Sequence, residues 1–147
     1  MADNVKSYEL DREVFSELER GKDTENLKKW QGVASNIASY VSTWGVERFW
    51  AMSRSLRLIG GVIPEFNDIG SDEAKRYFAW AVARIVLCNI VGNDLGINAD
   101  MTTKEFQERY RELNFNQQTL LIELLLQIAD TIQFWTMRIK DANGQDV

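Results

Sequence analysis

The segment that most constrains the fold of this chain covers residues 117–140. Its large apolar side chains recur at steps of four, three, four, three and four residues, the spacing of one face of an α-helix. These positions are Leu121, Leu125, Ile128, Ile132, Trp135 and Ile139. More apolar residues widen this face and leave a narrow polar edge at Glu123, Gln127 and Asp130. A helix this apolar must be covered on several sides, so we expect the other segments to pack around it.

Five further segments carry the same helical period. They cover residues 9–20, 24–44, 46–59, 71–91 and 103–113. Gly45 either breaks or only bends the chain between the second and the third of these, so we expect five or six helices. The alternation of apolar and polar residues that is typical of strands is not seen in the sequence. The sequence therefore predicts an all-α fold, a single compact helical bundle over residues 1–147 with frayed tails at 1–8 and 141–147.

The composition argues against catalysis. Histidine is absent from the 147 residues, which removes the most common metal ligand and the most common general acid or base. The single cysteine, Cys88, lies inside an apolar run and is typical of a small buried hydrophobe. No serine lies in a strand–turn–helix elbow, and Gly60–Gly61 lacks the lysine and hydroxyl of a phosphate loop. We therefore expect no enzymatic activity, no catalytic residues and no cofactor.

Residues 94–105 have the length of an EF-hand calcium loop but break its pattern. Gly96 stands at the third position, where a side-chain oxygen is needed, and Ala99 stands at the sixth, where the turn needs glycine. Glu105, at the twelfth position, is better explained by a capping box with Thr102 that opens the helix of 103–113. We expect no metal site here.

Two further features concern location and packing. The chain begins with a polar segment that lacks the apolar region of a signal peptide, and the apolar run 85–92 is too short to span a bilayer. We therefore expect a cytoplasmic protein without membrane contact. The five tryptophans fall on apolar helix faces, which predicts core packing. Trp30 or Trp44, at helix ends, could instead anchor a protein partner.

Basic residues gather on two neighbouring segments, although the net charge of −5 gives no general attraction to nucleic acid. The candidate contacts are Arg48, Arg54, Arg57, Lys75, Arg76 and Arg84. On adjacent helices that face outward together, they could follow a nucleic-acid backbone without reading bases. The alternative is that they are ordinary surface cations, some of them paired with acids such as Glu47, Asp72 or Glu73.

Three segments carry a resemblance to a known family: VERFWAMSRSLRLI, EAKRYFAWAVARIV and the closing LLIELLLQIADTIQFW. Together they resemble the small subunit of CRISPR effector complexes, in the form that matches the C-terminal helical domain of the type I-D large subunit. The resemblance implies a non-catalytic subunit in antiviral defence, stacked with copies of itself along the complex and contacting its backbone subunits. It would line a path for the guide RNA and the target or displaced DNA strand, with the six basic residues on phosphates.

A second hypothesis belongs to another class of protein. The chain would be a helical adaptor, or a phage-encoded inhibitor, whose acidic N-terminal helices cover a basic surface of a partner protein. The two hypotheses differ in the salt dependence of binding, because contacts to phosphates weaken steeply as salt rises.

Overall fold

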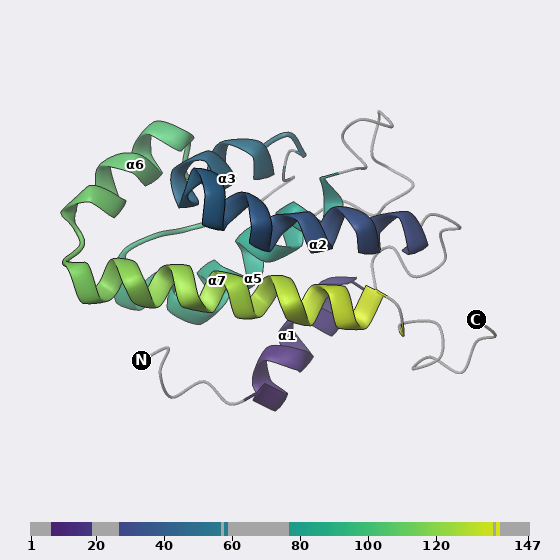
Figure 1. Ribbon diagram of the computed structural model, residues 1–147. Coiled ribbons are helices and arrows are strands. Elements are labelled where there is room, and N and C mark those ends of the chain that lie inside the picture. Colours follow the sequence, from purple (N-terminus) through teal and green to yellow (C-terminus); the bar gives the residue numbers. More distant parts are fainter. Residues whose placement is uncertain (1–6, 19–26, 57, 59–76, 137, 139–147) are drawn as a thin grey trace.

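The computed structural model describes residues 7–18, 27–56, 58, 77–136 and 138, with the side chains of the second helix described from Asn36 onward. The described residues form six helices that pack together, and they contain no strand, which confirms the predicted all-α bundle (Figure 1). The helices are α1 (Ser7–Leu18), α2 (Leu27–Trp44), α3 (Val46–Ser53), α5 (Phe78–Leu95), α6 (Thr103–Glu112) and α7 (Phe115–Thr136).

Helix α7 lies alongside α2 over much of its length and also packs against α1 and α5 (Figure 1). The predicted apolar face is buried at its first four positions, Leu121, Leu125, Ile128 and Ile132. Trp135 is half-buried, and Ile139 lies outside the described residues. The polar edge at 123, 127 and 130 is exposed, as expected. The helix starts at Phe115, two residues before the predicted start, because Asn114 and Gln117 exchange bonds from backbone N–H to side-chain oxygen.

Helix α5 is buried more completely than α7. Its residues 78–87 are all buried, and the helix contacts α1, α2, α3 and α7. It has the length and apolar composition of a membrane span, but 72% of that window is buried inside the bundle, which accounts for its composition. It packs against α7, although α7 makes its most extensive contacts with α2. The expected helix start at 71 lies outside the described residues.

Gly45 breaks the chain between α2 and α3. Its φ of 90° and ψ of 168° lie in a region that residues with a Cβ rarely adopt, so glycine is needed at this turn. The buried positions of α2 include Ile37 and Val41, whereas Trp44, the last residue of α2, is 53% exposed. The prediction that Trp44 packs in the core is therefore wrong, because the buried face of α2 ends before it.

Helix α3 ends at Ser53, well before the predicted end of its segment at 59. The backbone N–H of Arg54 bonds to Ala51 O at 3.2 Å, and that of Ser55 bonds to Met52 O at 3.1 Å, so the last turn tightens and closes. The Ser53 hydroxyl also donates to Trp50 O at 2.7 Å, an alternative partner for a helical carbonyl. Arg54 therefore stands at the end of the helix and not within it.

The capping box that opens α6 is present as predicted. The Thr102 side chain accepts from the backbone N–H of Glu105 at 3.1 Å, and the Glu105 carboxylate accepts from the backbone N–H of Thr102 at 2.9 Å. Residues 97–102 form the link between α5 and α6, starting after Gly96, which caps α5 with a φ of 69°. This link faces the end of α3 and forms one wall of the pocket described below.

Candidate anion-binding pocket

Three of the six basic residues predicted from the sequence lie within the described part of the chain, and they do not form one outward row. Arg48 is exposed on α3, Arg54 is half-buried at the end of α3, and Arg84 is 1% exposed inside α5. The expectation that these side chains face outward together is wrong for Arg84, because every side of its helix is covered at that level. The other three predicted contacts, Arg57, Lys75 and Arg76, lie outside the described residues.

Arg84 is a buried cation in the most apolar helix of the protein. Its Nη1 donates to Ser53 Oγ at 3.0 Å, and its guanidinium carbon lies 5.9 Å from the centroid of the Trp50 ring. Its Nε is buried and has no hydrogen-bond partner among the described residues. Burial and, to a smaller extent, the nearby charge of Arg54 lower the pKa of Arg84 to about 10. The guanidinium is still protonated at neutral pH, so a positive charge is held inside the protein.

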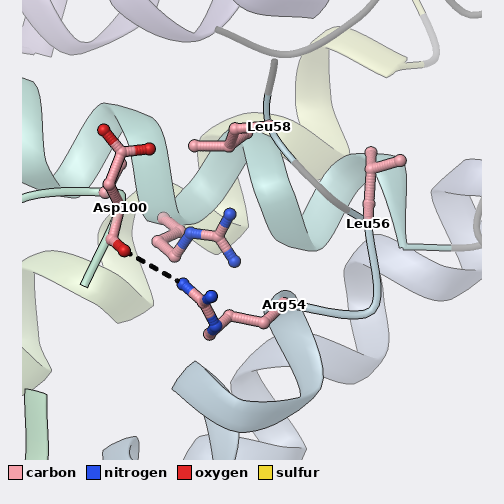
Figure 2. A pocket seen from close by; sticks show the side chains of 6 residues that line it. Arg54, Leu56, Leu58 and Asp100 are labelled. Atoms are coloured by element: carbon pink, nitrogen blue, oxygen red, sulfur yellow. Dashed lines mark hydrogen bonds between the residues drawn. The ribbon is translucent and has the colours of Figure 1, made fainter. Parts of the chain in front are cut away.

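Arg54 approaches the same place from the end of α3. Its Nη1 donates to the carbonyls of Met101 and Asp100, the second at 3.3 Å. Figure 2 shows Arg54 reaching toward the Asp100 backbone, while the Asp100 carboxylate points away from the guanidinium. Trp50 Nε1 donates to the same Met101 carbonyl at 3.0 Å. These bonds join α3 to the link at residues 97–102.

Arg54 and Arg84 line one pocket with a volume of about 250 Å³. In the part of the chain that the structure describes, the rest of its lining is Leu56, Leu58, Ala99 and Asp100 (Figure 2). Among the described residues, no carboxylate oxygen lies within ion-pair distance of either guanidinium. Two like charges in a partly dehydrated site repel each other, and an anion between them would relieve this repulsion. The arrangement is therefore suited to binding an anion.

The described residues offer little other chemistry. They contain no group of three or more histidine, cysteine or acidic side chains that could hold a metal ion. Burial raises the pKa of the Cys88 thiol to about 12, so this residue stays protonated and is a poor nucleophile at neutral pH. Glu105 is engaged in the capping box, as the sequence predicted.

Trp44 and Arg48 form a second surface at the turn between α2 and α3. We call these two residues the α2–α3 corner. The Arg48 guanidinium carbon stands 4.4 Å from the centroid of the exposed Trp44 ring. A hollow of about 460 Å³ lies on one side of Trp44 and includes Tyr40 and Trp80 in its lining. Another of about 440 Å³, beside Arg48, extends to Tyr110 and Ile122. The corner thus places a cation and an aromatic ring between two hollows.

Sequence reasoning missed the difference between these two sites, although one signal was available. Three tryptophans are each followed by an arginine four residues later, in the pairs Trp44–Arg48, Trp50–Arg54 and Trp80–Arg84. In the described contacts, Arg48 lies over the ring of Trp44, the tryptophan of its own pair. Arg84 instead lies over the ring of Trp50. The last pair lies in an almost wholly apolar segment, and this context was the signal that Arg84 is buried.

Comparisons of the chain with protein-family models, with curated proteins and with solved structures found no match.

Proposed function

We propose that this protein is a non-catalytic binding subunit whose α2–α3 corner holds the backbone of a single-stranded nucleic acid. The observation that carries the proposal is the exposed Trp44 ring with the Arg48 guanidinium over it. Proteins that bind single strands without reading sequence combine an aromatic ring, on which a base stacks, with cations that contact phosphates. The corner supplies both from adjoining helices.

The charges around the corner favour this role. Glu47 is next to Arg48 in the sequence, and its carboxylate forms an ion pair with Arg111 at 3.1 Å. Arg111 therefore offsets the negative charge that would otherwise oppose phosphate binding at Arg48. The chain contains a second pair of the same kind, Phe134 and Arg138, with the guanidinium carbon 4.3 Å from the ring centroid. That pair lies beside a hollow lined by Asp11 and Asp130, whose charges repel phosphates. The two pairs therefore form a matched test and control.

This role is that of the small subunit of a CRISPR interference complex, the family that the sequence resembles. In such a complex the neighbouring subunits and the guide RNA supply most of the affinity and all of the sequence specificity. A net charge of −5 suits a subunit whose protein contacts hold it in place. On this proposal Arg48 contacts phosphate. Arg54 is held by the carbonyls of Met101 and Asp100, and Arg84 is too deeply buried to touch a polymer.

The test is the affinity for fluorescently labelled single-stranded DNA and RNA, measured by anisotropy over a range of salt concentrations. We expect weak binding whose logarithm falls with the logarithm of salt by about 0.7 for each phosphate contacted. Trp44→Ala should weaken binding about tenfold or more, because one stacked base contributes roughly 1–3 kcal/mol. Arg48→Gln should reduce the salt slope by about 0.7. Phe134→Ala and Arg138→Gln should leave both quantities unchanged.

A second candidate is docking of a partner protein at the same corner, the adaptor hypothesis. The observation in its favour is the 53% exposure of Trp44 beside an apolar hollow whose lining includes Tyr40 and Trp80. An apolar side chain of a partner would fill the hollow and pack against the Trp44 ring. Binding of this kind depends weakly on salt. No detectable nucleic-acid binding at low salt, by a protein with normal helicity, would favour this candidate over the first for the isolated chain.

A further inference from the structure

We propose that the pocket between Arg54 and Arg84 is a binding site for a small phosphate dianion, either inorganic phosphate or a small phosphate monoester. The proposal does not depend on the role of the α2–α3 corner, because it concerns different residues and a ligand of a different size. It rests on three observations: a cavity, a pair of guanidiniums that line it, and, among the described residues, no carboxylate within ion-pair distance of either guanidinium.

One edge of the Arg84 guanidinium is not used by the described residues. Nη1 of this guanidinium already donates to Ser53 Oγ, at 3.0 Å. The other edge, formed by Nε–H and Nη2, is the edge by which arginine binds the oxygens of a phosphate or carboxylate. The Nε atom is closed to solvent and has no acceptor among the described residues, so Nη2 is the atom of this edge that an oxyanion in the pocket can reach.

The charge of the pocket favours a dianion. Arg54 and Arg84 bring two positive charges, and the nearest acidic side chain in the lining, Asp100, is exposed and is not within ion-pair distance of either. A phosphate with a charge near −2 at neutral pH matches this balance better than a monoanion does. Arg54 is fixed in place by the carbonyls of Met101 and Asp100, so the second cation is already oriented before the ligand arrives.

The size of the pocket limits the ligand. Its volume of about 250 Å³ lies below the range of roughly 300–1,000 Å³ that is typical for drug-sized ligands. A phosphate leaves room for a small organic group, which would contact the apolar part of the lining at Leu56, Leu58 and Ala99. A nucleic-acid strand is excluded, because Arg84 is 1% exposed and a polymer backbone cannot reach it.

The buried Arg84 could serve to brace Ser53 or to bind an anion, and one substitution distinguishes these two roles. If Arg84 only braced Ser53, an apolar side chain of similar length would stabilise the protein, because Ser53 Oγ keeps its bond to Trp50 O. If Arg84 binds an anion, the same change also abolishes the response to phosphate. The variant Arg84→Met thus gives two readouts, the melting temperature without ligand and the shift that the ligand causes.

The experiment is thermal unfolding of the full chain at about pH 7, with sodium phosphate compared with sodium chloride and sodium acetate at equal ionic strength. At about 10 mM phosphate and a dissociation constant of about 1 mM, we expect phosphate to raise the melting temperature by about 4 °C more than chloride does. Acetate, a monoanion, should raise it less. Titration calorimetry with inorganic phosphate gives the dissociation constant directly.

Arg84→Met should remove the phosphate shift and raise the melting temperature without phosphate by about 3 °C. Arg54→Gln should reduce the shift to less than half. Arg84→Lys keeps the charge but lacks the planar fork, so it should bind phosphate at least threefold more weakly than the wild type. The matched control is Arg109→Gln. Arg109 Nε donates to the carbonyl of Leu95 at 2.7 Å, so this arginine braces a nearby backbone carbonyl from outside the pocket. The control should lower the melting temperature and keep the full phosphate shift.

Three results would overturn the proposal. The first is a wild-type shift that is no larger in phosphate than in chloride. The second is a shift that survives in both Arg84→Met and Arg54→Gln. The third concerns an occupant from the chain itself, since four acids, Glu65, Asp68, Asp72 and Glu73, lie in the segment 59–76 outside the described residues. If replacing them by their amides lowers the melting temperature and creates a phosphate response absent from the wild type, the natural occupant is one of these carboxylates.

Discussion

The α2–α3 corner and the Arg54–Arg84 pocket use the same residue types in opposite surroundings. At the corner, the Arg48 guanidinium carbon lies 4.4 Å from the ring centroid of Trp44, which is 53% exposed. In the pocket, the guanidinium carbon of Arg84 lies 5.9 Å from the ring centroid of Trp50, and both residues are buried. An exposed cation is available to a large polymer and keeps its water. A buried cation has lost that water and can be reached only by a small ligand.

This difference decides what each arginine contributes to the folded protein. The exposed pair costs little when empty, because water solvates the guanidinium. The buried pair destabilises the fold when empty, because desolvation and the charge of Arg54 both oppose the protonated form of Arg84. The bond to Ser53 and a bound anion both act against this destabilisation, and mutations distinguish their contributions.

The largest expected difference is between the two tryptophans. Trp50 is fully buried, stacks on Phe106 with 4.1 Å between ring centroids, and donates to Met101 O at 3.0 Å. Trp50→Ala should lower the free energy of unfolding by about 3–5 kcal/mol, because it leaves a cavity and removes one of the two hydrogen bonds to Met101 O. Trp44→Ala should change it by less than about 0.5 kcal/mol. Urea unfolding measures both, and equal losses at the two positions would contradict the comparison.

The next difference is between the two arginines that stand beside those rings. Arg84→Met should raise the free energy of unfolding by about 1–3 kcal/mol in phosphate-free buffer, because it replaces a buried cation without an acidic partner by an apolar side chain. Arg48→Met should leave it within about 0.5 kcal/mol of the wild type. Denaturant titrations followed by circular dichroism give both values. A loss of stability in Arg84→Met would show that the bond to Ser53 outweighs the burial of the charge.

Replacing Arg54 is expected to change the free energy of unfolding by an intermediate amount, and in the opposite direction to Arg84→Met. Arg54→Gln should lower the free energy of unfolding by about 1 kcal/mol, since the side chain loses its bonds to the carbonyls of Asp100 and Met101. The link at residues 97–102 should then open more often, and amide hydrogen exchange within it should speed up relative to α7. Unchanged exchange in the link would mean that Trp50 alone holds it in place.

The smallest effect concerns the other end of that link, where α6 begins. Hydrogen bonds from the Thr102 backbone and side chain lower the pKa of Glu105. Because the pKa is lower in the folded state than in the unfolded state, the resulting stabilisation is present above the unfolded pKa and is lost as pH falls through the folded pKa. Glu105→Gln should remove this part of the acid sensitivity, as seen in urea unfolding between about pH 3 and pH 7. If the acid sensitivity is the same in the variant, the capping box contributes no measurable linkage.

Much of the fold was predictable from local rules. The apolar face of 117–140, the capping box of Thr102 and Glu105, and the turn at Gly45 each depend on residues within a few positions of one another. The side chains buried on α7, and the exposure of its polar edge, follow from the helical period alone. The end of α3 was placed six residues too late, because the apolar period of its segment continues past the point where the backbone turns away at Arg54.

The candidate sites were predicted less well, and the reason is physical. The sequence by itself determined that basic residues gather on the segments before and after 60–70, and that the helix carrying Arg84 is apolar nearly all round. Only the tertiary structure decided which arginine is buried, because the partners come from distant parts of the chain. Arg84 meets Ser53 across 31 positions, and Arg54 meets Met101 across 47. Helical periodicity reports which face a residue lies on, whereas the packing of α3, α5 and the link at residues 97–102 decides whether that face meets water, an aromatic ring or a second cation.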